Sequence, residues 1–342
     1  MKMKGVSLVE AKKFEVIEKE QPEVKENYVK VKVHKAGICG SDVNLFWSIG
    51  ERAGTDFLEG HEFSGEVVDP NGSDFKKGDR VVIIDLSPCY ECEYCKSGRE
   101  QLCDSVFNEV NGISIDGGFG EYVIVRKDLL RKIPDNMSYT KAAMIEPMAI
   151  SYHACKEAGV KEGDNVLVTG GGPIGLFAAL SAEVLGAKSV TITEVNDDRL
   201  EILRDSFFID HAINGLDENL DEKLNEISPD GFDVVLECTG NKYAATTGFN
   251  HVKKGGKLII IAIHDLPELN VTKLIHEEIT VKGVVMFTIE EFEEVIKIFS
   301  DDNLDIEKYA QLIQMEDVQD TVEKMVEGKA NKMKYIIDVA RD

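Results

Sequence analysis

The feature that most constrains the fold is a glycine-rich turn between an expected strand and an expected helix. The turn reads Gly-Gly-Gly-Pro-Ile-Gly over residues 170–175, directly after the apolar run at 165–169. In the spacing G-x-G-x-x-G, the first glycine allows a tight turn, the second lets the backbone approach a pyrophosphate, and the third lets helix pack on strand. The pyrophosphate would lie on the N–H groups at the start of the helix, which is expected from Ile174 to Leu185. The turn therefore predicts a dinucleotide site.

An acidic residue at the end of the next strand indicates which dinucleotide is bound. Glu194 follows the strand expected at 190–193. A carboxylate there accepts hydrogen bonds from the adenosine ribose and repels a 2′-phosphate, which favours NAD over NADP. Arg199 could bind a 2′-phosphate, so NADP is less favoured but stays open. The predicted dinucleotide-binding residues are Gly170, Gly172, Pro173, Ile174, Gly175, Glu194 and Arg199.

The hydrophobic pattern changes at Pro147. Before it, short apolar or alternating runs separated by Gly, Asp and Asn predict an antiparallel, barrel-like unit. These runs cover residues 28–33, 64–68, 80–84 and 121–125. After it, apolar strands alternate with amphipathic helices, which predicts an α/β unit with a doubly wound parallel sheet. The later elements are strands at 166–168, 190–193, 233–236, 257–261 and 280–285, then helices at 290–300 and 318–326 and a strand at 335–339.

The composition is that of an ordinary globular protein of two domains. Its 342 residues are 43% hydrophobic and 30% charged, and this length exceeds one typical core of ~150 residues. The net charge of −24 repels phosphate backbones and anionic lipids, so neither nucleic acid nor a membrane is expected as a partner. No apolar run approaches the ~18 residues that span a bilayer, and no secretory leader is recognisable, so a cytoplasmic protein is expected.

Four of the seven cysteines fall within one short segment, with the spacing Cys89-x2-Cys92-x2-Cys95-x7-Cys103. Four thiolates enclose one Zn²⁺ tetrahedrally at ~2.3 Å and leave no position for substrate, so this site is predicted to be structural. An iron–sulfur cluster is a weaker alternative, because the last gap is long and Asp104 rather than proline follows the final cysteine. The clustering of these cysteines and the odd number of cysteines in the chain favour metal binding over disulfide bonds.

A second group of potential metal ligands is more widely spaced. Cys39 stands in the run Cys-Gly-Ser-Asp, and His61 stands in Gly-His-Glu about twenty residues later. A single Cys or His is more often a core residue than a ligand, so the pair alone is only suggestive. Glu146, at the junction of the two regions, could supply a further ligand. Zn²⁺ accepts mixed sulfur, nitrogen and oxygen ligands, and three protein ligands with one open position form a catalytic site.

These motifs occur in the order found in one enzyme family. The chain also contains Gly-Asp-Arg-Val at 78–81 and Gly-Gly-Phe-Gly-Glu-Tyr at 117–122. Together the motifs resemble the zinc-dependent medium-chain alcohol dehydrogenase family over essentially the whole chain. Within it, Glu146-Pro147 and Gly40 resemble the sorbitol (polyol), butanediol and threonine dehydrogenase branch.

The resemblance implies a two-domain α/β fold. A GroES-like, β-rich catalytic domain would comprise residues 1–147 and 288–342 and carry the structural zinc lobe at 87–105. A Rossmann NAD-binding domain would comprise residues 148–287, and the active site would lie in the cleft between the domains. Family members commonly pair through the edge of the Rossmann sheet, so a homodimer or homotetramer is expected.

The resemblance also implies two zinc ions and their ligands. Cys39 and His61 would bind the catalytic zinc, and Glu62 or Glu146 would complete the shell directly or through water. Cys89, Cys92, Cys95 and Cys103 would bind the structural zinc. The implied enzyme transfers hydride between NAD and a small secondary alcohol or polyol whose hydroxyl group is bound to zinc.

Two residues near Cys39 are implied to serve the reaction. Asp42 would accept a hydrogen bond from the His61 imidazole and fix its tautomer, and Ser41 would take the alcohol proton. Polyol-branch members usually carry a histidine three residues after this serine. Here the position is Asn44, which cannot titrate near neutral pH. Proton exit is then expected to use water or another group.

The substrate pocket departs from the polyol branch at a second place. Sorbitol dehydrogenases have an arginine in the segment that here reads Val-Val-Met-Phe, and Met286 takes its place. With Phe46 and Trp47, Met286 is expected to make the pocket more apolar, although ordinary packing explains the two aromatic residues equally well. A polyol or another secondary alcohol is the leading expectation. Butanediol and other small diols, threonine and other hydroxy acids, cyclitols and sugar phosphates stay open.

Two other classes of protein share parts of this pattern. Zinc-free NADPH quinone reductases of the same superfamily need neither ligand group. A non-catalytic NAD-binding sensor or structural protein would keep one structural zinc but lose Cys39, His61 or Ser41, and all three are present. Zinc content separates the classes, because the enzyme needs an open site besides the closed one.

Overall fold

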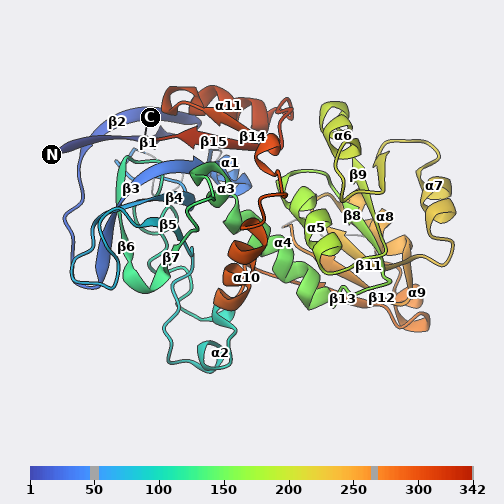
Figure 1. Ribbon diagram of the computed structural model, residues 1–342. Coiled ribbons are helices and arrows are strands. Elements are labelled where there is room, and N and C mark those ends of the chain that lie inside the picture. Colours follow the sequence, from blue (N-terminus) through green and yellow to red (C-terminus); the bar gives the residue numbers. More distant parts are fainter. Residues whose placement is uncertain (47–53, 263–268, 341–342) are drawn as a thin grey trace. The chain divides into compact units, whose positions relative to one another are not determined.

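Two units, each with its own β-sheet, make up the chain. The computed structural model describes residues 1–46, 54–262 and 269–340 (Figure 1). One unit comprises Met1–Glu146 and Thr288–Asp342, and the other comprises Pro147–Phe287. Within the described ranges, no helix is both long enough and apolar enough to cross a membrane. The chain therefore leaves the first unit once and returns to it.

The second unit contains a six-stranded sheet in which all neighbouring strands are parallel, in the order β10-β9-β8-β11-β12-β13. The strands are β8 (Asn165–Thr169), β9 (Ser189–Glu194), β10 (His211–Asn214), β11 (Phe232–Glu237), β12 (Val252–Ile260) and β13 (Thr280–Gly283). The central strands are apolar because both of their faces are covered, and Leu167, Val168, Val235 and Leu236 are fully buried. The predicted parallel sheet is confirmed.

Helices cover both faces of this sheet. They are α5 (Pro173–Val184), α6 (Asp197–Arg204), α7 (Leu220–Ile227), α8 (Lys242–Asn250) and α9 (Val271–His276), preceded by α4 (Ile145–Ala158). Right-handed crossovers run from β8 towards β10 and from β11 towards β13, so α5 and α6 cover one face and α8 and α9 the other. Leu224 of α7 and Phe249 of α8 belong to one buried apolar cluster. The strand order reverses between β8 and β11, and ligands of such sheets bind at the carboxyl ends of the strands at that point.

The first unit contains a seven-stranded sheet and a separate hairpin. The sheet order is β14-β15-β3-β4-β5-β7, with β6 also paired to β3. The strands are β1 (Lys2–Glu10) and β2 (Lys13–Glu20) of the hairpin, β3 (Tyr28–Gly37), β4 (Glu62–Asp69), β5 (Arg80–Ile83), β6 (Tyr122–Arg126), β7 (Leu130–Lys132), β14 (Ala310–Ile313) and β15 (Lys334–Asp338). β15 pairs antiparallel with β3, and Ile336 lies opposite Gly37. This pairing brings a late segment of the chain next to the loop that follows β3.

Short helices carry several site residues of this unit. They are α1 (Gly40–Phe46), α2 (Glu93–Lys96), α3 (Tyr139–Ala142), α10 (Ile289–Phe299) and α11 (Val318–Val326), with 3-10 turns η1 (Glu100–Leu102), η2 (Lys127–Leu129), η3 (Glu307–Tyr309) and η4 (Met315–Asp317). A capping box starts α10: Thr288 N–H donates to Glu291 Oε2 at 2.9 Å, and Glu291 N–H donates to Thr288 Oγ1 at 3.2 Å. Such a box satisfies two N–H groups at the helix start and fixes where the chain re-enters the first unit.

Candidate active site and metal centres

Cys39 lies on the loop between β3 and α1, where Asp42 holds it. Asp42 is buried, and its Oδ2 accepts the backbone N–H of Cys39 at 2.8 Å. Asp42 Oδ1 and His61 Nδ1 are buried and have no hydrogen-bond partner among the described residues. Asp42 therefore positions the loop of Cys39, and the expected hydrogen bond from the His61 ring is replaced by this backbone contact.

His61 precedes β4 on a loop that a second segment supports closely. Gly118 N–H donates to Gly60 O at 2.7 Å, and a Cβ on Gly112 would collide with the Gly60 backbone. Gly112 also has a φ of 79°, which is readily adopted only by glycine. A larger residue at position 112 would displace the loop that carries His61.

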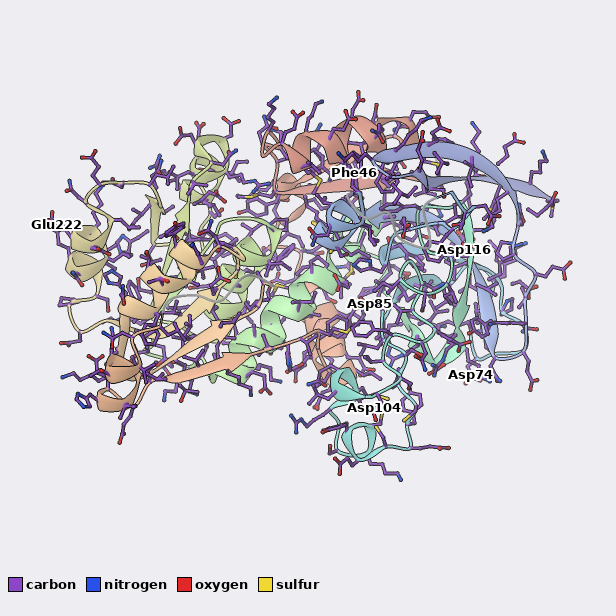
Figure 2. All side chains as sticks on the ribbon, turned by 180° about the vertical axis from the view of Figure 1, so that it is seen from behind. Phe46, Asp74, Asp85, Asp104, Asp116 and Glu222 are labelled. Atoms are coloured by element: carbon purple, nitrogen blue, oxygen red, sulfur yellow. The ribbon has the colours of Figure 1, made fainter. Side chains whose placement is uncertain are left out.

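Two overlapping groups of potential metal ligands meet at His61. One is Cys39, His61 and Glu62, and the other is His61, Asp85 and Glu146; in each, the ligand atoms lie within 4.8 Å of one another. Glu62 begins β4, Asp85 follows β5 (labelled in Figure 2), and Glu146 lies in the first turn of α4. Sequence analysis missed Asp85, because nothing in its apolar surroundings, Ile-Ile-Asp-Leu, distinguishes it from the end of a strand.

A buried lysine neutralises one of these carboxylates. Lys334 Nζ is ion-paired with Glu62 Oε2 and donates to Ile38 O at 3.0 Å, and the side chains of Lys334 and Glu62 are only 3% and 1% exposed. Glu62 Oε2, Asp85 Oδ1 and Glu146 Oε2 all lack a hydrogen-bond partner within the described ranges, so the ion pair with Lys334 is what distinguishes Glu62. Glu62 thus already has a cation, whereas the other two carboxylates remain open to one.

The pKa values in this cluster reflect an excess of buried negative charge. Burial, reinforced by Asp85 and Glu62, raises the pKa of Glu146 well above its usual range. Burial also raises the pKa of Asp85 to about 6. Burial disfavours the charged form of His61, but the negative groups around it, led by Cys39, outweigh burial and raise its pKa. A divalent cation at this place would relieve the repulsion among the acids.

The donor set fits zinc. His61 Nδ1, Asp85 Oδ1 and Glu146 Oε2 are buried, and no described residue hydrogen-bonds them. Leaving such atoms unsatisfied costs free energy unless a water or an ion binds them. Thiolate, imidazole and carboxylate are the ligands that zinc takes in proteins, and all three types occur here.

A cavity of about 300 Å³ lies beside His61 in the first unit. Its walls include Ser41, Asn44, Leu45, His61 and Ile113. Ser41 and Asn44 are exposed and offer a hydroxyl and an amide, while Leu45 and Ile113 offer apolar surface. The cavity therefore suits a small molecule that carries both polar groups and a short carbon chain.

The three residues expected to make the substrate pocket apolar lie in different surroundings. Phe46, labelled in Figure 2, is buried and stacks on Phe14 with ring centroids 6.2 Å apart. It belongs to the core and is absent from the cavity wall, so the packing explanation applies to it. Trp47 lies outside the described residues. Met286 belongs to the second unit and has a φ of 51°, in the left-handed region.

The four clustered cysteines converge around α2 and η1. Their sulfur atoms lie within 4.8 Å of one another, and Cys89 Sγ and Cys95 Sγ are 4.0 Å apart. Two ligands of a tetrahedral zinc with bonds of ~2.3 Å are separated by ~3.8 Å. Figure 2 shows yellow sulfur atoms near the label of Asp104. The geometry fits one closed zinc site.

Backbone and hydroxyl groups stabilise thiolates in this cluster. Cys92 N–H donates to Cys89 Sγ at 3.3 Å, and Cys95 N–H donates to Cys92 Sγ at 3.4 Å. Burial would raise the pKa of Cys103, but hydrogen bonding, chiefly with Ser105, outweighs burial and lowers it to about 6. Zinc binds thiolates rather than thiols, so these contacts favour metal binding.

The glycine-rich turn joins β8 to α5 at the carboxyl edge of the parallel sheet. Gly170 has a φ of 93°, and a Cβ on Gly175 would collide with the Gly170 carbonyl. Both positions therefore need glycine, as the spacing predicts. Gly172 is the N-cap of α5, with Pro173 at the first helical position followed by Ile174, where the free N–H groups of the helix can meet an anion.

Glu194 and Arg199 lie next to this turn. Glu194 Oε2 accepts Gly171 N–H at 3.1 Å, and its Oε1 accepts Asn196 N–H at 2.9 Å. Arg199 Nη1 lies 3.9 Å from the place where a Cβ on Gly172 would stand. The structure thus brings together the residues predicted to bind the dinucleotide.

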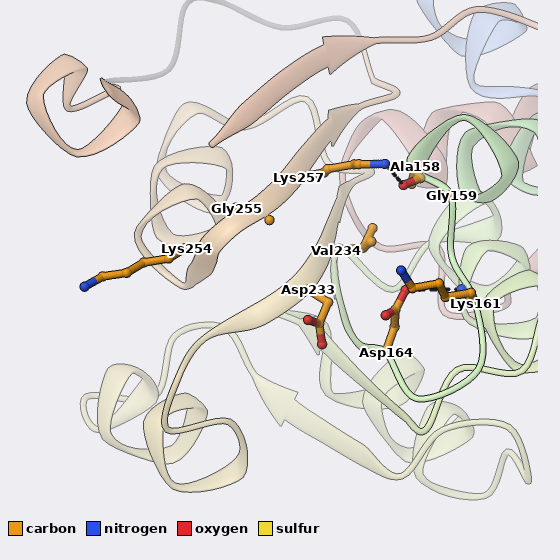
Figure 3. Close-up of a pocket in the computed structure, with 10 residues that line it drawn as sticks. Ala158, Gly159, Lys161, Asp164, Asp233, Val234, Lys254, Gly255 and Lys257 are labelled. Atoms are coloured by element: carbon orange, nitrogen blue, oxygen red, sulfur yellow. Dashed lines mark hydrogen bonds between the residues drawn. The ribbon is translucent and has the colours of Figure 1, made fainter. Parts of the chain in front are cut away.

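A smaller cavity of about 130 Å³ lies at the opposite edge of the same sheet (Figure 3). Lys257 Nζ donates to Ala158 O at 2.6 Å, and Asp233 accepts Asn165 N–H at 2.9 Å, so these polar groups are satisfied within the chain. Asp233 stands at the amino end of β11. Ligands of doubly wound sheets bind at the carboxyl ends, so this cavity is not the coenzyme site.

Profiles of two protein families match the chain. The alcohol dehydrogenase GroES-like domain matches residues 25–135, and the zinc-binding dehydrogenase domain matches residues 173–301. The first match lies in the β-rich unit, and the second covers most of the parallel sheet. The expected combination of a GroES-like and a Rossmann domain is confirmed.

Individual proteins are similar over most of the chain. The sorbitol dehydrogenase of Halalkalibacterium halodurans is 37% identical over 278 residues, which are 79% of this chain and 80% of that protein. The L-threonine 3-dehydrogenase of Pseudoalteromonas translucida is 35% identical over 250 residues, 71% of this chain and 72% of that protein. A crystal structure of an alcohol dehydrogenase from Escherichia coli CFT073, complexed with NADH, has a TM-score of 0.88 at 25% identity and covers 98% of this chain and 99% of that one.

Site, fold and relatives lead to the same assignment. The chain is an oxidoreductase that uses zinc and a nicotinamide dinucleotide to act on a small molecule. It belongs to the zinc-dependent medium-chain alcohol dehydrogenase family, in the branch of the sorbitol and threonine dehydrogenases.

Proposed function

We propose that this protein oxidises a polyol or another secondary alcohol with NAD, at a zinc ion held by Cys39, His61 and Glu146. The proposal rests on one observation above all: ligand atoms of His61, Asp85 and Glu146 lie within 4.8 Å of one another, and each of these residues has a buried polar atom without a hydrogen-bond partner among the described residues. The cavity of about 300 Å³ beside His61 supplies space for the substrate.

Glu146 is the better third ligand than Glu62. Lys334 is paired with Glu62, so moving that carboxylate onto zinc would leave a buried lysine without its partner, at a large cost in free energy. Glu146 Oε2 has no such partner to give up among the described residues. Asp85 lies in the same group and would stay beside the three ligands as a further negative group.

The chain's own residues hold the substrate and its proton. Zinc, when bound, supplies a Lewis acid that lowers the pKa of an alcohol and makes hydride loss to nicotinamide feasible near neutral pH. Ser41 Oγ is exposed at the cavity and would take the hydroxyl proton and pass it to water. Leu45 and Ile113 would pack on the carbon chain, and Asn44 would hydrogen-bond a neighbouring hydroxyl group.

The pH dependence of alcohol oxidation should show no imidazole on the proton path. Asn44 borders the cavity with Ser41, and its amide does not titrate. With zinc bound, His61 and the neighbouring acids stay deprotonated. We therefore expect the profile of kcat/KM against pH to lack a limb near ~6.5, the ordinary pKa of histidine, and Asn44→His to introduce one. A limb near that pH in the native enzyme that Asn44→His leaves unchanged would contradict this role for Asn44.

Coenzyme preference should depend on Glu194. Its carboxylate would accept the ribose hydroxyls and repel a 2′-phosphate. We expect Glu194→Ala to weaken NAD binding by ~10-fold, the effect of losing a hydrogen bond to a charged group, and to improve NADP binding. Removing Arg199 as well should abolish the gain with NADP. Titration of both coenzymes into native, Glu194→Ala and Glu194→Ala/Arg199→Ala protein measures this; an unchanged NAD/NADP ratio would refute the assignment.

The substrate is proposed from the cavity and the relatives together. Sorbitol and L-threonine, after which two relatives are named, both carry a secondary hydroxyl group next to another polar group. The mixed walls of the cavity suit that pattern. We would test this substrate class by following the reduction of NAD through absorbance. The substrates to compare are sorbitol, other polyols, butanediol, cyclitols, sugar phosphates and threonine. Turnover of primary alcohols alone would exclude the proposed class.

Assembly and location are proposed on separate grounds. Among the described residues, strand β13 is one edge of the parallel sheet, and a second copy could pair with its outer side. Val271 and Ile275 of nearby α9 are exposed apolar residues, which also favours a homodimer or homotetramer. All seven cysteines are free of disulfides, which suits the reducing conditions of the cytoplasm.

A further inference from the structure

A second segment besides the glycine-rich turn lies at the reversal of strand order, where ligands of doubly wound sheets bind. Strands β8 and β11 are paired there, and Glu237, the last residue of β11, lies opposite Thr169. Cys238 N–H then donates to Thr169 O at 2.9 Å. The segment that follows β11 is therefore fixed beside the start of the glycine-rich turn.

Thr239 packs directly on the first glycine of the turn. The place where a Cβ on Gly170 would stand is 2.5 Å from Thr239 Cγ2 and 3.3 Å from Thr239 N. Gly170 therefore needs to be glycine for Thr239 as well as for its own φ of 93°. Any shift of Thr239 would therefore move the backbone of Gly170, which belongs to the turn expected to bind the pyrophosphate.

A single buried carboxylate holds this segment. Glu237 is 0% exposed; its Oε1 accepts Thr239 N–H at 2.8 Å and the Thr239 hydroxyl, and its Oε2 accepts Gly240 N–H at 3.4 Å. Burying a carboxylate is costly unless hydrogen bonds compensate for lost hydration. These donors belong to Thr239 and Gly240, in the turn that directly follows Glu237. The carboxylate therefore stabilises the turn, and the turn offsets part of the cost of burying the carboxylate.

The network of hydrogen bonds continues from this turn to the start of α8. Asn241 N–H donates to Thr239 Oγ1 at 2.8 Å, and Asn241 Oδ1 accepts Tyr243 N–H at 2.8 Å as the N-cap of the helix. Glu237, Thr239 and Asn241 thus form one chain of hydrogen bonds from the sheet to the helix. Such linked bonds fix a turn more firmly than separate contacts do.

We infer that Glu237 is a positioning residue for coenzyme binding, which it serves by holding Thr239 against Gly170 of the glycine-rich turn. The inference rests on the proposed use of NAD. It goes beyond the glycine-rich turn, Glu194 and Arg199, since Glu237 is itself buried and would affect the coenzyme through the position of Thr239.

Direct titration of NADH into the zinc-loaded enzyme, without alcohol, tests this inference. We expect Glu237→Gln and Thr239→Val each to raise the Kd for NADH by ~10-fold, the usual effect of removing a charge-assisted hydrogen bond. The double variant should bind no more weakly than either single variant, because both remove the same contact. Thr239→Ser lacks the Cγ2 methyl group but keeps the hydroxyl group that Glu237 binds, so it should bind NADH more tightly than Thr239→Val.

The outcomes separate this inference from the proposed function. Glu222 is exposed on α7 (labelled in Figure 2), so Glu222→Gln is the matched control and should keep the native Kd. If native enzyme binds no nicotinamide dinucleotide, the proposed function fails. Suppose that native enzyme binds NADH and that folded Thr239→Val has a Kd within ~2-fold of the Kd of Thr239→Ser. This difference is smaller than the contribution of one such hydrogen bond, so Glu237 would have only a structural role. If Glu237→Gln does not fold, the comparison of Thr239→Val with Thr239→Ser still tests the role of Glu237.

Discussion

Replacing Cys39 with alanine is expected to lower bound zinc from two ions per chain to one and to reduce kcat/KM by ~10³-fold or more, since metal activation of the hydroxyl contributes several kcal/mol. Cys39 belongs to the mixed group around His61 and not to the four-cysteine cluster. Without this thiolate, the site around His61 loses one of its three proposed ligands and should no longer retain zinc. Elemental analysis together with initial rates measures both effects.

The control for this variant is a cysteine outside both metal groups. Cys155 is buried in α4, and its thiol donates to Ala178 O at 3.5 Å. Cys155→Ala should keep two zinc ions and native turnover, with a loss of about 1 kcal/mol in the free energy of unfolding from the small cavity it leaves. If Cys39→Ala kept two zinc ions and normal turnover, Cys39 would not be a ligand of a catalytic metal.

Replacing Cys92 with serine is expected to act on stability rather than on chemistry. The segment at 87–105 has few buried apolar residues besides the predicted ligands Cys95 and Cys103, so zinc is expected to supply most of its order. Structural zinc contributes ~10 kcal/mol to folding in small zinc domains, and a loss of at least ~3 kcal/mol is expected here. Zinc content should fall to one ion per chain, and proteases should cleave within this segment.

Turnover distinguishes the two zinc sites. Enzyme with Cys92→Ser that remains folded should retain kcat within a few-fold of native, because the closed cluster offers no position to substrate. Thermal unfolding, limited proteolysis and rates on the same preparation give the comparison. Native stability with two zinc ions would contradict the structural role, and a kcat as low as that of Cys39→Ala would show that the sites are not independent.

The sequence predicted those parts of the molecule that depend on local spacing. The turn at 170–175 needs glycine at Gly170 and Gly175 for reasons that hold within a few residues. The four cysteines likewise fall within one short loop, so their spacing alone brings the sulfur atoms together. The alternation of strands and helices after Pro147 also predicted the parallel sheet, because each apolar run is buried on both faces.

Other features depend on contacts between distant segments and gave no local signal. Lys334 reaches Glu62 because β15 pairs with β3, which joins residues about three hundred positions apart. Asp85 becomes a potential ligand only where its loop meets His61 and the start of α4. The hairpin of β1 and β2 was missed because its second strand is largely exposed and charged, Lys-Phe-Glu-Val-Ile-Glu-Lys-Glu.

Two residues singled out from the sequence make contacts that the motifs alone do not specify. Phe46 ends α1 and turns into the core, where it stacks on Phe14 of β2, because a helix of two turns presents its last residue on the same face as Asp42. Asp42 bonds the backbone of Cys39 rather than the ring of His61. Family motifs fix which residues are near each other, whereas the partner of each atom depends on the local backbone.

Anomalous diffraction at the zinc absorption edge from crystals of the native enzyme tests the central claim most directly. The account predicts two zinc peaks per chain, one within the four-cysteine cluster and one bonded to Cys39 Sγ at ~2.3 Å and to His61 and Glu146 at ~2.0–2.2 Å. A single peak in the four-cysteine cluster, or a second peak bonded to neither Cys39 nor His61, would contradict it.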